Sequence, residues 1–170
     1  MLTSYLHSSS AEYIIITSPL LSEAADSLKQ IYSNYIEPEL RLETEVALIN
    51  INTNAYQIRD LIQQTLIQNS DLKYLLLMGD ETIIPPVYKN NTPSDDFFSS
   101  IEIDSGKPRL ATGRLILNNL SDALQIVDKI KQYSLNLKPG IWRSKVALIS
   151  DDQYKGGSYN KNELNHMVNS

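Results

Sequence analysis

The sequence predicts an α/β fold in which a mostly parallel sheet carries helices on both faces, and three observations lead to this prediction. Short runs of consecutive apolar residues recur along the chain, as expected of strands buried on both faces. Segments with one apolar face at helical spacing alternate with these runs, and such alternation over short links builds a right-handed parallel sheet. The 170 residues, 42% of them hydrophobic and 21% charged, suit one domain with a sizeable core.

The first half of the chain carries three predicted strands and two predicted helices. The strands are the apolar, β-branched or leucine-rich runs YIIIT, VALINI and YLLLM, at 13–17, 46–51 and 74–78. An amphipathic helix is expected from Leu21 to Tyr35, and Pro38 closes it. The second helix follows Thr53 or Asn54, either of which can accept hydrogen bonds from its first free N–H groups.

A long connection separates the third strand from the rest of the chain. Between Gly79 and Arg109 prolines, asparagines and serines interrupt every long element. A connection of this length is unusual inside a compact domain and often marks a functional loop or an inserted hairpin. A plain surface excursion is the alternative.

Regular structure is expected again in the second half. No second domain boundary is visible, so residues 1–170 are predicted to form a single domain. The expected elements are a strand at 110–117, a helix at 121–133 capped by Asn119 or Ser121, a strand at 146–149 and a short helix from Asn160.

Composition excludes several classes of function for this chain. A net charge of -5 without a cluster of lysine or arginine argues against a nucleic-acid or anionic-membrane surface. The absence of cysteine excludes a thiol nucleophile, disulfides and cysteine-based metal sites within these residues. The sequence contains no run of about 18 apolar residues, which a membrane span would need. Met1–Ser10 does not have the pattern of a signal peptide.

The common catalytic motifs are absent as well. The sequence contains no G-x-S-x-G, H-E-x-x-H, Walker A or G-x-G-x-x-G pattern. His7 lies in a serine-rich terminus and His166 in the last expected helix, and a histidine without an oriented partner is more often a surface or packing residue than a base.

Acidic residues follow two of the predicted strands. Asp80 and Glu81 come after the third strand, and Asp151 and Asp152 after the last one. The carboxyl ends of parallel strands open onto one edge of the sheet, where ligands of such folds bind. Each acid alone fits ordinary turn or cap chemistry. Together they favour a functional rim, either a cation site or carboxylates that orient a histidine.

The long connection contains further candidate metal ligands. Asp95, Asp96 and Asp104 offer the oxygen ligands that Ca²⁺ accepts, although EF-hand spacing is absent. Calcium is the one cofactor that the sequence suggests. Arg59, Arg109 and Arg114 are too scattered to define an anion site.

Three longer segments carry a resemblance to a known family. They are IRDLIQQTLIQNSDLKYLLLMGDETIIP (58–85), SDDFFSSIEIDSGKPRLATGRL (94–115) and ALQIVDKIKQYSLNLKPGIWRSKVALISDD (123–152). The first contains a strand that ends in Gly-Asp, the second a Ser-Asp pair and a Gly-Arg strand, and the third ends in Asp-Asp. In this order and spacing they resemble the gingipain-type cysteine peptidases, particularly the sortase component of the type IX secretion system, over nearly all of 13–167.

The resemblance implies a caspase-like, Rossmann-like three-layer unit, with residues 1–170 as the incomplete N-terminal portion of a peptidase domain. The family's catalytic histidine and cysteine follow the matched region. Asp152 falls where the family carries an acidic residue proposed to orient that histidine, a role in which a carboxylate fixes the imidazole tautomer. The sequence departs from the family at Arg109, usually acidic, and at Thr112, usually isoleucine, which puts a metal ligand in that turn in doubt.

Two hypotheses follow. In the first, the chain is part of an exported endopeptidase or sortase, secreted or associated with the outer membrane. Its substrate would be a polypeptide, and the chain would need the missing C-terminal catalytic half to be active. In the second, the chain is a non-catalytic α/β binding or interaction module that retains the peptidase scaffold.

Overall fold

The computed structural model describes residues 10–89, 91–100, 108–135, 140 and 145–146. The chain divides into two compact units, Met1–Leu137 and Lys138–Ser170. Only three residues of the second unit are described, so the described fold is that of the first unit. Apart from Val146, the strand predicted at 146–149 lies outside the described residues, and so does the helix predicted from Asn160.

The centre of the first unit is a four-stranded parallel sheet with the strand order β2-β1-β3-β6. Strand β1 is hydrogen-bonded on both sides, and its Ile15 lies opposite Val46 of β2 and Leu76 of β3. The strands are β1 Tyr13–Thr17, β2 Thr44–Leu48, β3 Tyr74–Met78 and β6 Ala111–Leu115.

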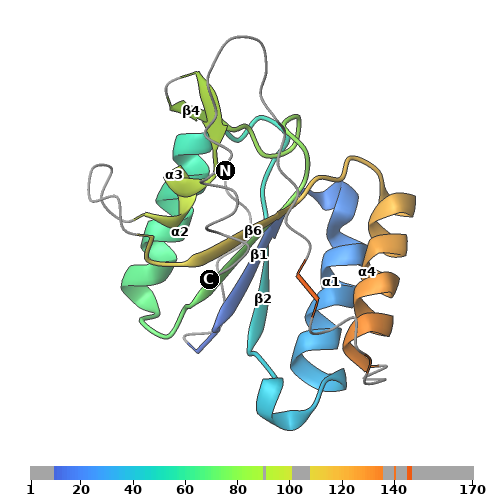
Figure 1. The fold of residues 1–170 in the computed structure, drawn as a ribbon. Helices are drawn as coiled ribbons and strands as arrows, with labels where there is room; N and C mark the ends of the chain where they lie inside the picture. The colour runs from blue at the N-terminus through green and yellow to red at the C-terminus, as the bar shows by residue number, and fades with distance from the viewer. Residues whose placement is uncertain (1–9, 90, 101–107, 136–139, 141–144, 147–170) are drawn as a thin grey trace, which may run out of the picture. The chain divides into compact units, whose positions relative to one another are not determined.

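Helices cover both faces of this sheet and make three layers (Figure 1). Helices α1 (Ser22–Gln30) and α4 (Leu120–Leu135) pack side by side on one face. Helices α2 (Ala55–Gln68) and α3 (Asp96–Ser99) lie on the other. The fold class predicted from the sequence is therefore confirmed.

The core explains why the strands lie where they do. Ile14, Ile15 and Ile16 are fully buried, so side chains on both faces of β1 are shielded from water. Leu75 and Leu77 of β3 are buried in the same core. Burying one such side chain stabilises the fold by about 1.5–3 kcal/mol. A strand with consecutive apolar residues points side chains to both faces of the sheet, so it can bury all of them only between two helical layers.

Asparagine side chains cap the N-termini of two of the helices. At α2, Asn54 and Gln57 form a reciprocal capping box, in which each backbone N–H donates to the other's side-chain oxygen at 3.0 Å. At α4, the N–H of Asp122 donates to Oδ1 of Asn119 at 2.9 Å. Of the caps proposed from the sequence, Asn54 and Asn119 are the ones used.

Three predicted boundaries are corrected by the structure. Strand β2 ends at Leu48, and Ile51 lies in a turn, 80% exposed, because β2 pairs only with β1 and Leu48 is opposite the last residue of β1. The helix expected from Leu21 to Tyr35 is regular only to Gln30 and continues as a π-helical segment. Strand β6 is shorter than the predicted 110–117. The π-helical segment after α1 is Ile31–Tyr35. A short 3-10 turn precedes α1 at Pro19–Leu21, and another follows the π-helical segment at Pro38–Leu40.

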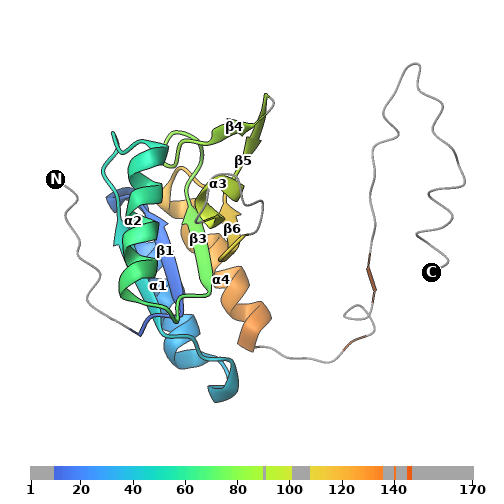
Figure 2. The ribbon, with the colours of Figure 1, turned by 90° about the vertical axis from the view of Figure 1, so that its left-hand side faces the viewer.

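The long connection after β3 contains an inserted hairpin, one of the two structures expected there. Strands β4 (Val87–Lys89) and β5 (Thr92–Ser94) pair antiparallel, and α3 follows directly. Asn91 turns the chain with a positive φ of 64°. Figure 2 shows the hairpin at one end of the sheet, beside α3.

Helix α3 is fixed to α2 through Arg59 and Phe97, and to the core through Phe98. Phe98 is buried in the core, and the Arg59 guanidinium lies 4.6 Å from the centre of the Phe97 ring. Nη2 of Arg59 also donates to the carbonyl of Ser100 at 2.9 Å. Within the part of the chain that is described, no helix is both long and apolar enough to cross a bilayer.

The turn after β3 depends on glycine, which gives a direct test of the fold. Gly79 has a φ of +157°, and a Cβ there would lie 2.7 Å from Cγ2 of the buried Ile83. We expect Gly79→Ala to lower the free energy of unfolding by about 2–4 kcal/mol through overpacking and backbone strain. Equilibrium unfolding in urea measures the loss.

Gly113→Ala is the matched control. A Cβ at Gly113, in β6, would have its nearest contact at 3.9 Å, with Cδ1 of Leu76. This variant should change the free energy of unfolding by less than about 1 kcal/mol. Equal losses for the two variants would contradict the packing described around Gly79.

Candidate functional site

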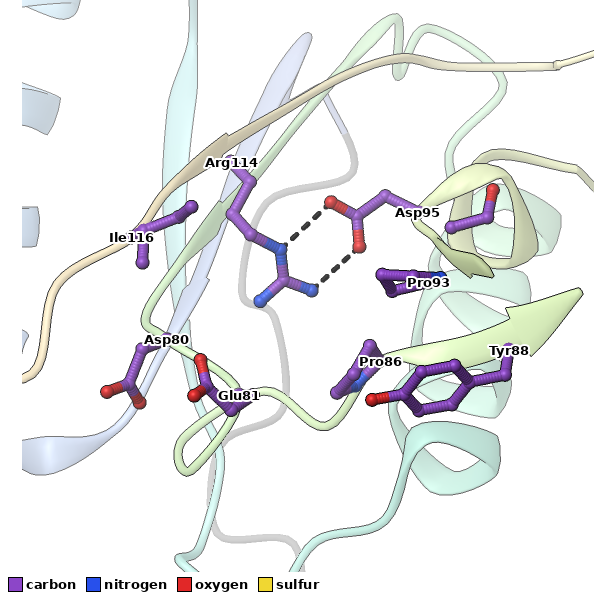
Figure 3. A pocket seen from close by; sticks show the side chains of 9 residues that line it. Asp80, Glu81, Pro86, Tyr88, Pro93, Asp95, Arg114 and Ile116 are labelled. Atoms are coloured by element: carbon purple, nitrogen blue, oxygen red, sulfur yellow. Dashed lines mark hydrogen bonds and ion pairs between the residues drawn. The ribbon is translucent and has the colours of Figure 1, made fainter. Parts of the chain in front are cut away.

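A pocket of about 360 Å³ lies where β3 and β6 end and the hairpin begins. It is therefore at the carboxyl edge of the sheet, where open α/β folds bind ligands. Figure 3 shows it from close by. The residues that line it are Asp80, Glu81, Pro86, Tyr88, Pro93, Ser94, Asp95, Arg114 and Ile116.

Arg114 is the residue that holds the pocket together. Its Nε and Nη2 donate to Oδ2 and Oδ1 of Asp95 at 2.9 and 2.7 Å, a bidentate ion pair (Figure 3). Its Nη1 donates to the carbonyls of Gly79 and Ile84, both at 3.1 Å. One guanidinium thus joins the end of β6, the turn after β3 and the residue that precedes α3.

Arg59 and Arg109, the two other arginines considered in the sequence, do not line this pocket. Arg59 holds α3, and Nη2 of Arg109 donates to the carbonyl of Ser70 at 3.2 Å. Since Arg114 is already paired with Asp95, the pocket carries no unbalanced positive charge among its described residues.

Asp80 is a buried carboxylate held by its own turn. Its Oδ1 accepts hydrogen bonds from the N–H and the hydroxyl of Thr82 at 2.9 and 2.6 Å. These bonds, together with one from Asn118, hold the pKa of Asp80 below its ordinary value, although burial acts in the opposite direction. Asp80 is therefore ionised at neutral pH.

Glu81 is the exposed carboxylate of the pocket. Within the described residues it makes no hydrogen bond or ion pair, so its charge is available to a ligand. Asp80 and Glu81 together leave the pocket negative, because Asp95 and Arg114 cancel each other. The rest of the lining is largely apolar, with Pro86, Pro93, Tyr88 and Ile116 as its walls.

The structure brings together some of the predicted site residues and leaves others aside. Asp80, Glu81 and Asp95 meet in the pocket, whereas Asp96 is exposed and does not line it. Asp104, Asp151, Asp152, His7 and His166 lie outside the described residues.

The calcium site stays a prediction, because Asp104 is one of its three candidate ligands. Both carboxylate oxygens of Asp95 already accept hydrogen bonds from Arg114. Across residues 10–89, 91–100 and 108–135, no three carboxylate or imidazole groups are grouped as a metal would require.

Six residues of the pocket lining were not predicted as site residues from the sequence, namely Pro86, Tyr88, Pro93, Ser94, Arg114 and Ile116. Tyr88 of β4 and Ile116, which follows β6, are exposed, and nothing in the local sequence pattern marks them as site residues. Arg114 did carry a signal, since an arginine inside a strand, within the Gly-Arg segment quoted above, needs acceptors close to the sheet.

Comparisons with known proteins give a family and a fold. The model for a family described as peptidase family C25 matches residues 7–170. No curated protein matches the chain. The fold is similar to that of the Arg-specific cysteine proteinase gingipain R (RgpB), with a TM-score of 0.60 and 22% identity over 75% of this chain and 29% of that one.

Two further structures share this fold. The complex of RgpB pro- and mature domains from Porphyromonas gingivalis gives a TM-score of 0.60 at 23% identity, covering 72% of this chain and 29% of that one. Dimeric latent PorU from the same organism gives a TM-score of 0.61 at 17% identity, covering 80% and 17%. The chain thus spans less than a third of each of these solved structures.

The ion pair between Arg114 and Asp95 predicts a stability effect. Arg114→Met leaves Asp95 and two half-buried carbonyls without a donor, so the free energy of unfolding should fall by about 2 kcal/mol. Asp95→Asn should cost about 1 kcal/mol, and the double variant less than the sum, since the two residues interact. Urea unfolding of the four proteins completes the cycle.

Arg109→Met is the control for this cycle, because the Arg109 side chain is exposed and donates a hydrogen bond to the backbone carbonyl of Ser70. Its effect should stay within about 0.5 kcal/mol. Strictly additive effects of Arg114→Met and Asp95→Asn would contradict the bidentate pairing.

Asp80 predicts how stability depends on pH. Its pKa is lowered in the folded state, so its contribution is fully present above the ordinary value of 3.8 and is lost as the pH falls through the lower folded value. Asp80→Asn should lower the free energy of unfolding by about 1 kcal/mol at neutral pH. The gap between the two proteins should close below the ordinary pKa. A gap that is constant from neutral to acid pH would show that the charge of Asp80 is not involved.

Proposed function

The chain belongs to peptidase family C25, and we propose that residues 1–170 are the N-terminal portion of the peptidase domain of a gingipain-like cysteine endopeptidase. The observation that carries the proposal is the family match over residues 7–170, which spans both compact units. The α/β fold shared with gingipain R and PorU supports it. Sortase-like processing of exported proteins, and export of the parent protein itself, belong to the same proposal through the sequence resemblance.

The chemistry divides between this chain and the remainder of the parent protein. The 170 residues contain no cysteine, so the nucleophilic thiolate and its histidine base would come from elsewhere in the parent. The histidine would take the thiol proton, and the thiolate would attack the peptide carbonyl. Asp152 would accept a hydrogen bond from the other imidazole nitrogen and stabilise the imidazolium that forms.

The described unit would serve as the rigid neighbour of that catalytic half. Its core and its braced carboxyl edge are built from its own residues, so it can frame an active site without supplying the reacting groups. A polypeptide substrate follows from the peptidase family.

A non-catalytic binding module is the second candidate, and the lack of cysteine favours it. The two candidates differ in what the parent gene encodes after Ser170. A Gly-His-Gly segment followed by a cysteine at a strand end supports the peptidase. A stop codon directly after Ser170 supports the module.

The activity itself can be measured on two proteins. We expect the parent protein to hydrolyse peptides in a thiol-containing buffer and to lose this activity on alkylation with iodoacetamide. Residues 1–170 alone should show no turnover, because they contain no thiol nucleophile. Robust, alkylation-resistant hydrolysis by the short chain would refute the proposal.

The role of Asp152 gives a further prediction for the parent enzyme. Asp152→Asn should lower kcat by about 100-fold or more, because the amide disfavours the tautomer that the base needs. Asp151→Asn is the matched control at the adjacent position and should leave kcat within about twofold. Thermal unfolding shows that both variants are folded. Equal activities for the two variants would remove Asp152 from the mechanism.

A further inference from the structure

Strand β2 is the outermost strand of the sheet and, among the described residues, pairs with a neighbour on one side only (Figure 1). The carbonyl of Glu43, just before β2, accepts a hydrogen bond from the N–H of Tyr13 at 3.1 Å. The N–H of Ile49, just after β2, donates to the carbonyl of Thr17 at 2.8 Å. Backbone groups of a strand alternate between its two sides, so the odd-numbered residues here face β1 and the even-numbered ones face outward.

Val46 and Leu48 therefore direct their N–H and C=O groups away from the sheet, and both residues are only half-buried. Thr44 faces the same way but is buried. Before the strand, this outer side is occupied, because the N–H of Leu42 donates to the carbonyl of Tyr32 in the π-helical segment at 3.1 Å. In the part of the chain that is described, no strand covers Val46 and Leu48 in the same way.

The edge of β2 lacks the usual protection against pairing with another strand. Proline, lysine and bulges commonly blunt such edges. Strand β2 contains neither proline nor lysine, and its register with β1 runs without a bulge. Its one charged side chain, Glu45, faces α1, where it lies 3.9 Å from Nζ of Lys29. The side chains of Val46 and Leu48 lie on the opposite face, and Ile51 in the following turn is 80% exposed.

We propose that the outer edge of β2 is a docking site for an extended, basic polypeptide segment, which adds to the sheet as a further strand. The N–H and C=O groups of Val46 and Leu48 exchange hydrogen bonds with the main chain of this segment. Side chains at alternate positions of the segment lie beside those of Val46 and Leu48, so β-branched residues suit these positions.

Charge favours a basic segment over an acidic one. The residues that lead into β2 include the exposed carboxylates of Glu37, Glu39 and Glu43, against the single exposed cation of Arg41. A lysine or arginine at the end of the segment beside Glu43 is attracted to this end of the strand, whereas an acidic segment is repelled.

The same charges disfavour a second copy of this chain as the occupant. In an antiparallel pair of two β2 strands, the residues placed beside Glu43 of one copy would come from 48–52 of the other. That stretch, Leu-Ile-Asn-Ile-Asn, contains no lysine or arginine to balance the carboxylates. The net charge of -5 on each copy opposes the association further.

The test uses the 170-residue chain labelled with ¹⁵N and a heptapeptide with blocked ends, Lys-Thr-Val-Thr-Val-Thr-Lys. At saturating peptide we expect the amides of Val46 and Leu48 to exchange with deuterium at least about fivefold more slowly, because they become donors to the peptide. The amides of Glu45 and Ala47 already face β1, so their exchange should change by less than about twofold. This alternation distinguishes strand pairing from contact through side chains.

Two altered peptides separate the contributions of backbone and charge. Methylation of the amide nitrogens of both valines and the central threonine removes backbone donors and should abolish the protection. Replacement of both lysines by glutamate should weaken binding at least about tenfold, and this difference should shrink as salt is added.

Two variants of one residue test the edge from the side of the protein. Val46→Pro removes only an outward N–H, and proline is tolerated in an edge strand at such a position, so pairing with β1 should persist. We expect the affinity for the lysine peptide to fall at least about tenfold. Val46→Thr is the matched control, because it keeps the N–H and the β-branch, and its affinity should stay within about threefold. Amide spectra report whether both variants are folded, and the methylated peptide gives the same test on the unaltered chain.

Four outcomes would overturn the proposal. They are the absence of protection at millimolar lysine peptide, equal slowing of exchange at Glu45 and Val46, equal binding of the methylated or glutamate peptide, and equal losses for Val46→Pro and Val46→Thr. Protection that grows with protein concentration in the absence of peptide would replace the basic segment by a second copy. The edge of β2 belongs to the first unit and needs no thiol or histidine, so its docking role and the proposed peptidase function can fail separately.

Discussion

The guanidinium of Arg114 is the contact on which the carboxyl edge of this unit depends. Ordering a long connection costs about 1–2 kcal/mol of backbone entropy per residue, so the segment between β3 and β6 needs compensating contacts. Burial of Phe98 and the stacking of Arg59 on Phe97 provide some of them. Arg114 provides the long-range closure, because its acceptors Asp95, Gly79 and Ile84 lie 19 to 35 residues away in sequence.

The same contact determines the electrostatic character of the pocket. A free arginine at this edge would make it a natural site for phosphate or a carboxylate. With its donors directed at Asp95 and at two carbonyls, Arg114 instead acts as a neutral part of the wall. The carboxylates of Asp80 and Glu81 then dominate the pocket. The pairing of Arg114 with Asp95 therefore changes the charge of the ligand that this edge favours from negative to positive.

Much of the fold could be predicted from the sequence, for a physical reason. Strands β1 and β3 have the predicted bounds because runs such as Ile14–Ile16 are apolar on both faces whatever their neighbours are. The bounds of β2 were wrong because the length of an edge strand is set by its partner, so the apolar residues up to Ile51 could not reveal where pairing ends. The π-helical segment after α1 likewise depends on tertiary context.

The candidate site was only partly predictable. The position of Asp80 and Glu81 followed from the rule that acids after parallel strands meet at one edge. The hairpin side of the pocket could not be placed, because nothing local to Tyr88 shows where the connection folds back. Two of the acceptors of Arg114 are backbone carbonyls, which every residue has, so no sequence pattern could have identified them.

The use of backbone carbonyls by Arg114 has an evolutionary consequence. The brace requires the arginine, one aspartate and the path of the main chain, but it does not require any particular side chain at Pro86, Tyr88 or Ile116. Positions in surface connections and short hairpins tolerate substitution well. A lineage can therefore change what the pocket recognises through single neutral steps, because selection for folding and selection for recognition act on different residues.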